Sequence, residues 1–208
     1  MNNVNSSATV NARIVLIDNI DSFSYNLVDE LSQLNYQLVV YRNTVPAETV
    51  IADLQQFNGP QVVCLSPGPG HPRSAGNLMT LLEFCAGRYP LLGICLGFQA
   101  LIEFSGGRVA RCGEVVHGKT ADMTTREHPI FTGVSSNNRC VVARYHSLSG
   151  YDLPATVNVI GDVNGIPMAA EFSACQALGF QFHPESLLTP KGKQLLANSM
   201  TYLLSQQV

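Results

Sequence analysis

A cysteine stands between two glycines in the segment GICLGFQA, at residues 93–100. The apolar run at 90–95 predicts a buried strand and the following residues predict a helix, so Cys95 lies where the strand turns into the helix. Small residues such as Gly93 and Gly97 avoid steric conflict in so sharp a turn. The amides that open the helix favour a thiolate and can stabilise an oxyanion. The pattern therefore predicts a nucleophile, with a buried structural cysteine as the alternative.

Two further segments carry residues that could complete such a site. SPGPGHP, at 66–72, follows a predicted strand, and its glycines leave backbone amides free to face a ligand. An ordinary turn is the alternative there, and no phosphate-loop pattern is present. GFQFHPES, at 179–186, places His183 at the end of a strand and Glu185 two residues later. An imidazole can serve as the base for a thiol and a carboxylate can orient it, although an isolated His-x-Glu is usually a surface pair.

The elements that must position these residues alternate through the first half of the chain. Strands are predicted at 13–18, 37–43, 61–66 and 90–95, and helices at 19–34, 46–57, 75–87 and 98–107. Asp21 or Ser22 is placed to cap the first helix, and Pro46 suits the first position of the second. Continuous apolar strands separated by helices indicate a parallel sheet covered on both faces. The loops that follow its strands then meet at one edge, where sites form.

Past residue 107 the pattern changes to strands joined by polar turns. The predicted strands lie at 115–125, 140–148, 157–163, 167–172 and 177–182, and an amphipathic helix at 190–206 follows them. We therefore expect an α/β fold with an open, mostly parallel central sheet, helices on both faces, and a mixed or antiparallel second half. One domain spans 13–208, after a polar, disordered lead-in at 1–12.

Composition excludes several classes of function. The chain has 208 residues, of which 46% are hydrophobic and 13% charged, with a net charge of −3. Without a basic stripe, nucleic acid and anionic membrane surfaces are not expected partners, and no apolar run is long enough to cross a bilayer. The first 12 residues lack the regions of a secretory signal, so we expect a cytoplasmic protein. Six cysteines without a C-x-x-C pair, and no metal-ligand spacing, predict no metal site.

The motifs GICLGFQA, SPGPG and FHPES together resemble the class I, triad-type glutamine amidotransferases, from about Ile14 to the C-terminal helix. The resemblance implies that Cys95 is the nucleophile, His183 the acid and base, and Glu185 the group that orients it. It also implies an oxyanion hole and a glutamine site, formed by Gly68, Pro69, Gly70, Leu96, Gln99, Ser147 and Leu148. The chain departs from the family at Phe98, where histidine is common.

Segments such as LIDNIDSFSYNLVDEL, VVHGKT and ARYHSL resemble the branch that serves chorismate-using synthases. Within it the chain is most similar to the glutaminase subunits of anthranilate synthase, with those of aminodeoxychorismate synthase as a close sister group; one subunit can also serve both enzymes. The resemblance implies L-glutamine as substrate, no cofactor in this chain, and a chorismate-binding synthase subunit as partner in a hetero-oligomer. His117 and Lys119 are then expected near that partner, and His146 near the substrate loop.

Two other classes of function compete with this one. A non-catalytic module could use the same fold, since a fold does not imply an activity. A free-standing cysteine hydrolase could act on another substrate, although the glycine loop, Gln99 and YHSL point to glutamine. We expect His71 and His128 to be surface residues, and most of the other cysteines to be small buried hydrophobes.

Overall fold

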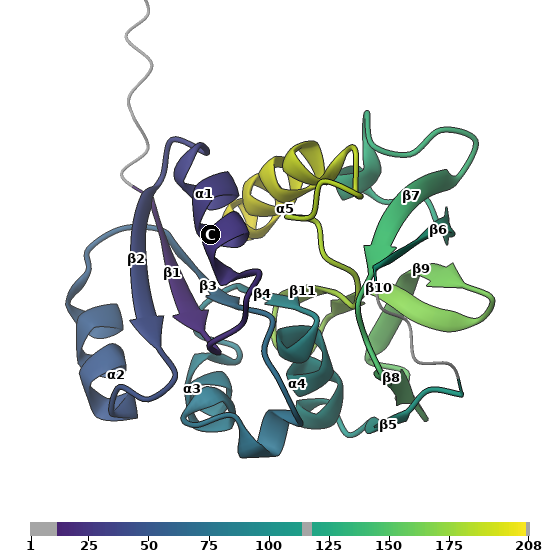
Figure 1. The fold of residues 1–208 in the computed structure, drawn as a ribbon. Coiled ribbons are helices and arrows are strands. Elements are labelled where there is room, and N and C mark those ends of the chain that lie inside the picture. The colour runs from purple at the N-terminus through teal and green to yellow at the C-terminus, as the bar shows by residue number, and fades with distance from the viewer. Residues whose placement is uncertain (1–11, 114–117, 207–208) are drawn as a thin grey trace, which may run out of the picture.

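The structure, a computed structural model, describes residues 12–113 and 118–206 (Figure 1). Its main feature is a nine-stranded sheet with the strand order β2-β1-β3-β4-β11-β10-β9-β6-β7. This mixed α/β architecture confirms the predicted fold class. The predicted lead-in at 1–12 and His117 lie outside the described residues, apart from Ala12, which is buried.

The first five strands of that order run parallel to one another. They are β1 (Arg13–Asp18), β2 (Gln37–Arg42), β3 (Gln61–Leu65), β4 (Leu91–Ile94) and β11 (Ala177–Phe180). Successive side chains point to opposite faces, so Ile14 and Leu16 join one apolar cluster while Val15 and Ile17 join the other. Both faces of the central strands are therefore buried, which explains their continuous apolar sequences.

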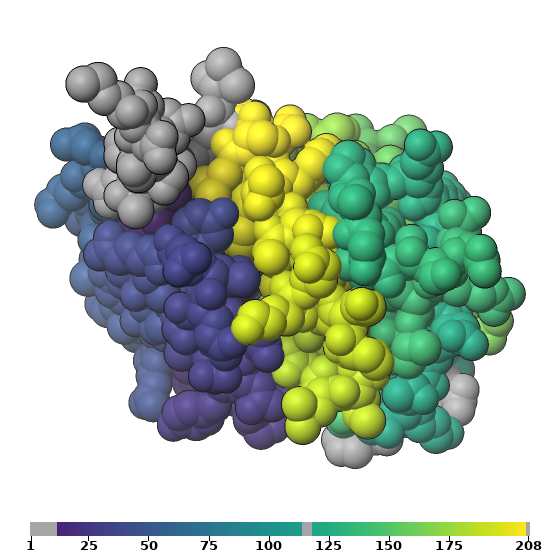
Figure 2. All heavy atoms as spheres, turned by 90° about the horizontal axis from the view of Figure 1, so that it is seen from above, coloured from purple at the N-terminus to yellow at the C-terminus, as the bar shows by residue number. Residues whose placement is uncertain are grey.

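Helices cover the two faces of this parallel half (Figure 1). One face packs against α1 (Ser24–Ser32) and α5 (Gly192–Ser205), whose leucines belong to the same cluster as Ile14. The other face packs against α2 (Ala47–Gln56), α3 (Leu78–Cys85) and α4 (Leu96–Phe104). In Figure 2, seen from above, α5 forms the yellow band between the N-terminal elements and the antiparallel half.

The antiparallel half consists of β10 (Ile166–Phe172), β9 (Val157–Val163), β6 (Lys119–Thr125) and β7 (Arg139–Arg144). The single strand predicted at 140–148 is wrong, because the chain leaves the sheet after β7. It then forms β8 (Leu148–Tyr151), which pairs with β5 (Arg108–Arg111) in a separate two-stranded sheet. Two short 3₁₀ helices lie at Pro72–Ser74 and Pro129–Phe131.

Several helices begin at other residues than predicted, because residues expected in the first turn of the helix belong to the preceding turn or loop. Helix α1 begins at Ser24, and its N-cap residue Phe23 makes no side-chain cap. Asp21 instead accepts a hydrogen bond from the Phe23 amide with its Oδ1, at 2.8 Å. Pro46 precedes α2 as its N-cap residue, and α4 begins directly after Cys95.

Candidate active site

Cys95 occupies a strained turn between β4 and α4. Its φ of 52° and ψ of −97° lie in a region that residues with a side chain rarely adopt, and its amide donates to the Phe180 carbonyl of β11 at 2.7 Å. The two flanking glycines make this turn possible. A Cβ at Gly93 would lie 2.6 Å from the backbone of Gly97, and one at Gly97 would collide with the carbonyl of Leu65. The thiol therefore lies at the N-terminus of α4, where the helix dipole favours negative charge.

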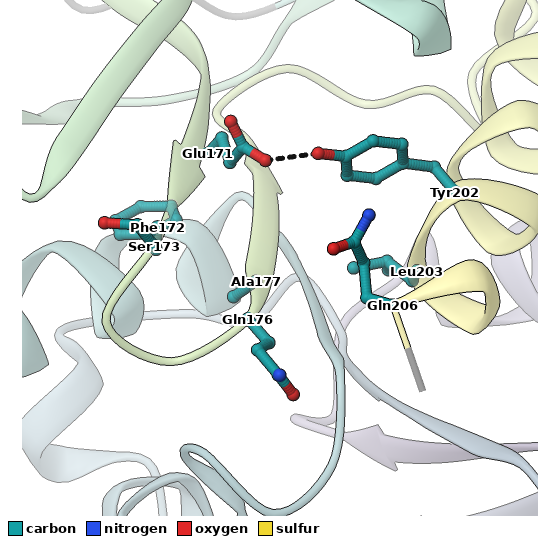
Figure 3. Close-up of a pocket in the computed structure, with 8 residues that line it drawn as sticks. All are labelled: Glu171, Phe172, Ser173, Gln176, Ala177, Tyr202, Leu203 and Gln206. Carbon is teal, nitrogen blue, oxygen red and sulfur yellow. Dashed lines mark hydrogen bonds between the residues drawn. The ribbon is translucent and has the colours of Figure 1, made fainter. Parts of the chain in front are cut away.

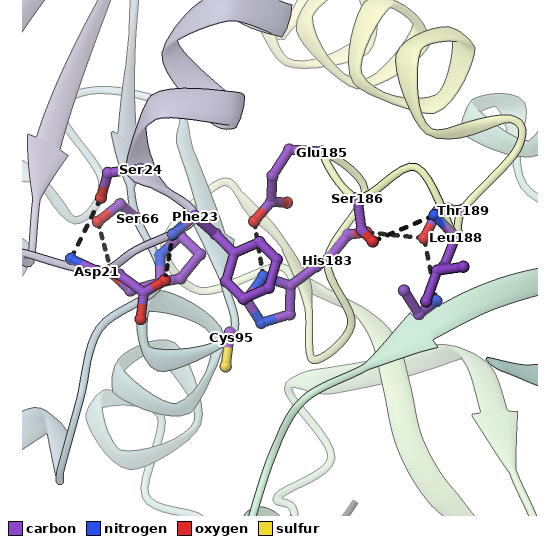
Figure 4. Close-up of polar contacts among 12 residues, drawn as sticks. Asp21, Phe23, Ser24, Ser66, Cys95, His183, Glu185, Ser186, Leu188 and Thr189 are labelled. Carbon is purple, nitrogen blue, oxygen red and sulfur yellow. Dashed lines mark hydrogen bonds and ion pairs between the residues drawn. The ribbon is translucent and has the colours of Figure 1, made fainter. Parts of the chain in front are cut away.

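His183 and Glu185 form a buried pair beside this thiol (Figure 4). The imidazole Nδ1 lies 2.6 Å from Glu185 Oε1, and the two residues are 2% and 4% exposed. A carboxylate only accepts hydrogen bonds, so Nδ1 carries the proton in this pair. The second ring nitrogen, Nε2, is buried and has no hydrogen-bond partner among the residues that the structure describes. It is the nitrogen left to exchange a proton with the thiol.

The charge of His183 depends on its two neighbours. Burial acts to lower its pKa, but the interactions with the Cys95 sulfur and with Glu185 outweigh burial and raise the pKa to about 10. At neutral pH the raised pKa therefore favours the imidazolium form of His183.

The backbone around His183 is held from the neighbouring strand. Its amide donates to the Ala143 carbonyl of β7 at 3.1 Å. The hydroxyl of Thr189 donates to the His183 carbonyl at 2.7 Å and accepts from the Ala143 amide at 3.0 Å. The rings of Phe23 and Tyr145 lie 4.8 and 5.3 Å from the imidazole, measured between ring centroids. These contacts fix the position of His183 and shield it from water.

A cavity of about 210 Å³ opens at the thiol. It is lined by Asp21, Gly68, Pro69, Gly70, Cys95, Gln99, Tyr145, His146, Ser147 and Leu148. Every residue predicted for the glutamine site and the oxyanion hole except Leu96 is in this lining. Leu96 lies directly behind it, since a Cβ on Gly68 would lie 2.5 Å from the Leu96 Cδ2. The structure thus brings these predicted residues together from three separate segments, and Asp21 adds a fourth.

His146 holds the substrate loop in place. It is 4% exposed, and its Nδ1 donates to the Leu148 carbonyl at 2.9 Å while its Nε2 accepts from Arg144 Nε at 3.1 Å. Burial lowers the pKa of His146 to about 4, and the charges of Arg144 and His183 act in the same direction. This histidine is therefore neutral at physiological pH and serves as a fixed donor and acceptor.

Gln181 is a site residue that the sequence analysis missed. It is fully buried, its Nε2 donates to the Cys95 sulfur at 3.7 Å, and its Oε1 accepts from Gln99 Nε2 at 3.2 Å. The sequence held one signal for this role. Gln181 is a polar residue between Phe180 and Phe182 in an apolar strand, and a buried amide needs hydrogen-bond partners. The strand ends at Phe180, one residue earlier, which frees Gln181 to point to the thiol.

The remaining histidines and cysteines lie apart from this chemistry. His71 and Arg73 approach the Glu103 carboxylate of α4 at 3.5 and 3.1 Å, which ties the end of the glycine loop to the nucleophile helix. The prediction that His128 is a surface residue is wrong, because its side chain is 8% exposed and its ring packs on Tyr202 at 4.9 Å.

None of the six cysteines forms a disulfide. Burial raises the pKa of the Cys85, Cys140 and Cys175 thiols to about 12, 11 and 11, so these thiols are unreactive.

A larger cavity, of about 280 Å³, lies at the opposite edge of the sheet, between the end of β10 and the end of α5 (Figure 3). There the Tyr202 hydroxyl donates to Glu171 at 2.5 Å, and this bond occupies the carboxylate. The lining contains no thiol, imidazole or glycine loop, so the smaller cavity at Cys95 is the candidate active site.

In the described part of the chain, no three His, Cys, Asp or Glu side chains gather in a metal-binding group. No helix among residues 12–113 and 118–206 is long and apolar enough to span a membrane.

This chain is similar to known proteins by family model, by sequence identity and by fold. The model of the family described as "Glutamine amidotransferase class-I" matches residues 15–203. The chain is 42% identical over 195 residues to "Anthranilate synthase component 2" of Vibrio parahaemolyticus, covering 94% of this chain and 98% of that protein. It is 43% identical over 196 residues to the protein of the same name in Haemophilus influenzae, covering 94% and 100%. A crystal structure of a glutamine amidotransferase from Thermotoga maritima shares the fold, with a TM-score of 0.71 at 16% identity over 93% of this chain and 98% of that one.

Proposed function

The chain belongs to the class I glutamine amidotransferase family, and from this membership we propose that it is the glutamine-hydrolysing subunit of anthranilate synthase. It would supply ammonia to a chorismate-binding synthase subunit that makes anthranilate for tryptophan biosynthesis. The observation that carries the proposal is the Cys95 elbow next to the His183–Glu185 pair, opening on a small polar cavity. The identity of about 42% to anthranilate synthase component 2 proteins supports the choice of partner.

The first half of the reaction is acyl transfer to the thiol. The Cys95 sulfur attacks the carbon of the glutamine side-chain amide, and the carbonyl oxygen becomes an oxyanion. The backbone amides of Gly68 and Leu96, one from the glycine loop and one from the start of α4, are the donors we assign to that oxyanion. His183, held as an imidazolium, gives its proton to the departing nitrogen, and ammonia leaves.

The second half hydrolyses the thioester. Acylation turns the sulfur into a thioester and so removes its interaction with His183, one of the two that keep the pKa of His183 high. The neutral imidazole can then take a proton from water, which attacks the thioester and releases glutamate and the free thiol. Glu185 orients the ring throughout by accepting from Nδ1. Gln181 positions the sulfur, and no step draws on a metal or on a cofactor of this chain.

The remaining features of the proposal concern substrate and compartment. Gln99, Ser147 and Leu148 would hold the far end of L-glutamine, where His146 keeps the Leu148 carbonyl in place. Six free cysteines suit a reducing compartment, which supports the cytoplasm as the place of action. The partner would bind in a hetero-oligomer, with neither nucleic acid nor membrane involved.

The decisive experiment replaces the nucleophile in the complex with the chorismate-binding subunit. Cys95→Ser should abolish anthranilate formation from glutamine, since serine cannot supply a thiolate, but should leave formation from added ammonium salts intact. Cys140→Ser is the matched control, because Cys140 is equally 8% exposed but lies in β7, and both ammonia sources should still serve this variant. Near-wild-type use of glutamine by Cys95→Ser would reject the assignment. Aminodeoxychorismate as the product would reassign the chain to the sister enzyme.

A further inference from the structure

Asp21 is an acidic side chain in the candidate substrate cavity to which the catalytic steps assign no role. It belongs to the turn between β1 and α1, which Figure 4 shows near Cys95. It lines the cavity together with Cys95, Gln99 and Ser147. Among residues 12–113 and 118–206, its carboxylate accepts one hydrogen bond, from the Phe23 amide to Oδ1 at 2.8 Å. The second carboxylate oxygen, Oδ2, makes no hydrogen bond or ion pair with those residues. The turn therefore orients the carboxylate and leaves Oδ2 for a ligand.

The charges of the cavity make this carboxylate unusual. No lysine or arginine is in the lining, and His146 is neutral because burial lowers its pKa to about 4. Asp21 is therefore the one acidic side chain among the described lining residues, and no lysine or arginine there opposes it. A cavity lining with an acidic side chain and no lysine or arginine favours a ligand that brings a positive group to that side chain.

The size of the cavity narrows the class of ligand. At about 210 Å³ it is smaller than the roughly 300–1,000 Å³ typical of sites for drug-sized molecules, so it suits a ligand of amino-acid size. When such a ligand places its side-chain amide at Cys95, its other end lies against the remaining lining. That end of glutamine carries an ammonium and a carboxylate, and only the ammonium is attracted by Asp21.

We propose that Asp21 is a specificity-determining residue that binds the α-ammonium group of glutamine through its free carboxylate oxygen. The proposal rests on the proposed glutaminase function and deepens it. The same charge repels the α-carboxylate, which is then directed to backbone amides and to the Gln99 amide. Asp21 thus selects free α-amino acids against amides that lack the amino group, and it fixes which way round the substrate binds.

The test compares two substrates in the complex with the chorismate-binding subunit, with ammonia release as the readout. Glutaramate is glutamine without its α-amino group. Wild type should prefer glutamine to glutaramate by at least about tenfold in kcat/KM, which is the scale of one charge-assisted hydrogen bond. Asp21→Asn keeps an oxygen for the Phe23 amide but loses the charge. It should lower kcat/KM for glutamine by about 10- to 100-fold, mainly through KM, and change that for glutaramate by less than about threefold.

Two further variants separate binding from folding. Asp21→Ser also retains an acceptor for the Phe23 amide and should behave like Asp21→Asn. Asp29→Asn removes an exposed carboxylate from the same helix region and should leave both substrates unaffected. Should both Asp21 variants fail to fold, the wild-type preference still decides, because equal use of the two substrates would overturn the proposal.

The outcomes distinguish this proposal from the function on which it rests. A wild-type complex that releases no ammonia from glutamine overturns the glutaminase function, and the Asp21 assignment falls with it. An active wild type whose substrate preference survives in Asp21→Asn overturns the Asp21 assignment alone. Equal losses for both substrates in a folded Asp21→Asn protein would assign Asp21 to the support of the turn instead of the recognition of the ammonium.

Discussion

At the scale of single residues, the site holds two histidines, of which His183 is charged and His146 is neutral at physiological pH. His183 has a raised pKa of about 10, because the sulfur and Glu185 outweigh the effect of burial. His146 has a lowered pKa of about 4, because burial is reinforced by Arg144 and His183. In the proposed mechanism the first histidine transfers a proton, whereas the second holds the Leu148 carbonyl in place. The environment of each ring therefore assigns its task.

The lowered pKa of His146 predicts a specific dependence of stability on pH. Above its ordinary pKa of 6.5, the residue is neutral in both the folded and the unfolded chain. As the pH falls from 6.5 towards 4, only the unfolded chain gains this proton, so the folded state loses stability. At pH 5 the loss should be about 1–2 kcal/mol relative to pH 7.5.

Urea unfolding of wild type and His146→Gln at pH 7.5 and pH 5 measures this effect, because all other titrating groups are common to the two proteins. The advantage of wild type over the variant should shrink at pH 5 by that amount. A difference that stays constant between the two pH values would show that His146 is not held neutral.

The family commonly has histidine at the position of Phe98. From the packing around Phe98 we expect this difference to affect stability and not catalysis. It is fully buried and packs edge-on against Phe172 at 5.9 Å, in the space left by Gly179. Phe98→His would place an imidazole among apolar side chains. It should cost about 2–4 kcal/mol of the free energy of unfolding and change kcat less than about threefold.

Urea unfolding and glutamine turnover, both on the folded protein, test this prediction. Phe104→His, on the same helix but 36% exposed, is the control and should cost less than about 1 kcal/mol. A rate loss of about a hundredfold in Phe98→His, or roughly 2.7 kcal/mol of barrier, would give residue 98 a role in catalysis.

At the scale of elements, the site lies where parallel strands end. β4 leads into Cys95, β3 into the glycine loop, β1 into Asp21, and β11 into Gln181 and His183. Because β4 and β11 are paired in register from Leu91–Ala177 to Ile94–Phe180, the residues that follow them lie side by side. The salt bridge from Arg73 to Glu103 then links the glycine loop to α4. The sheet therefore sets the spacing between Cys95, the His183–Glu185 pair and the glycine loop.

Thr189 connects the base to the antiparallel half, so Thr189→Val tests that connection. The variant keeps the shape of the side chain but leaves the Ala143 amide without its acceptor. We expect a loss of about 1–3 kcal/mol in the free energy of unfolding and about a tenfold fall in kcat, with KM little changed. Thr201→Val, on the exposed side of α5, is the control for both measurements. An unaltered kcat in Thr189→Val would mean that the Ala143–His183 bond alone positions the base.

At the scale of the whole molecule, the chain brings the residues of the site together but does not complete every contact between them. The thiol, the imidazole and the glycine loop are in place, yet His183 Nε2 has no hydrogen-bond partner in the described part of the chain. A glutaminase that releases ammonia into water wastes its substrate, because ammonia is protonated there. A partner that completes the geometry on docking would prevent that loss.

We therefore expect the isolated chain to be a poor glutaminase that the chorismate-binding subunit activates. Small displacements of oxyanion donors can cost about a hundredfold, so glutamine turnover should rise by up to that factor in the complex, and further with chorismate. The loops best placed to respond are the glycine loop at 66–72 and the segment that includes Lys119. Steady-state glutamate release by the chain alone, by the complex, and by the complex with chorismate measures the effect. Equal rates in all three would identify a free-standing glutaminase.

Local patterns in the sequence were enough to predict the alternation of strands and helices and the residue types at the strand ends. Apolar runs such as 13–18 and 61–66 can be buried only between two layers of helices, so the parallel sheet follows from local patterns. The glycines beside Cys95 likewise indicated a sharp turn, because a tight approach of backbones tolerates no Cβ. These properties depend on residues close together in the chain.

Which strand ends meet could be seen only in the folded chain. The pairing of β11 with β4 joins segments far apart in the sequence, and no local pattern specifies such a pairing. For the same reason the roles of Gln181, Thr189 and Asp21 were not visible, since each depends on a partner from another element. The break between β7 and β8 was also missed, because no glycine or proline in 140–148 marks the point where the chain leaves the sheet and places Ser147 at the cavity. Local sequence selects elements, whereas burial and hydrogen bonding across the whole chain select their neighbours.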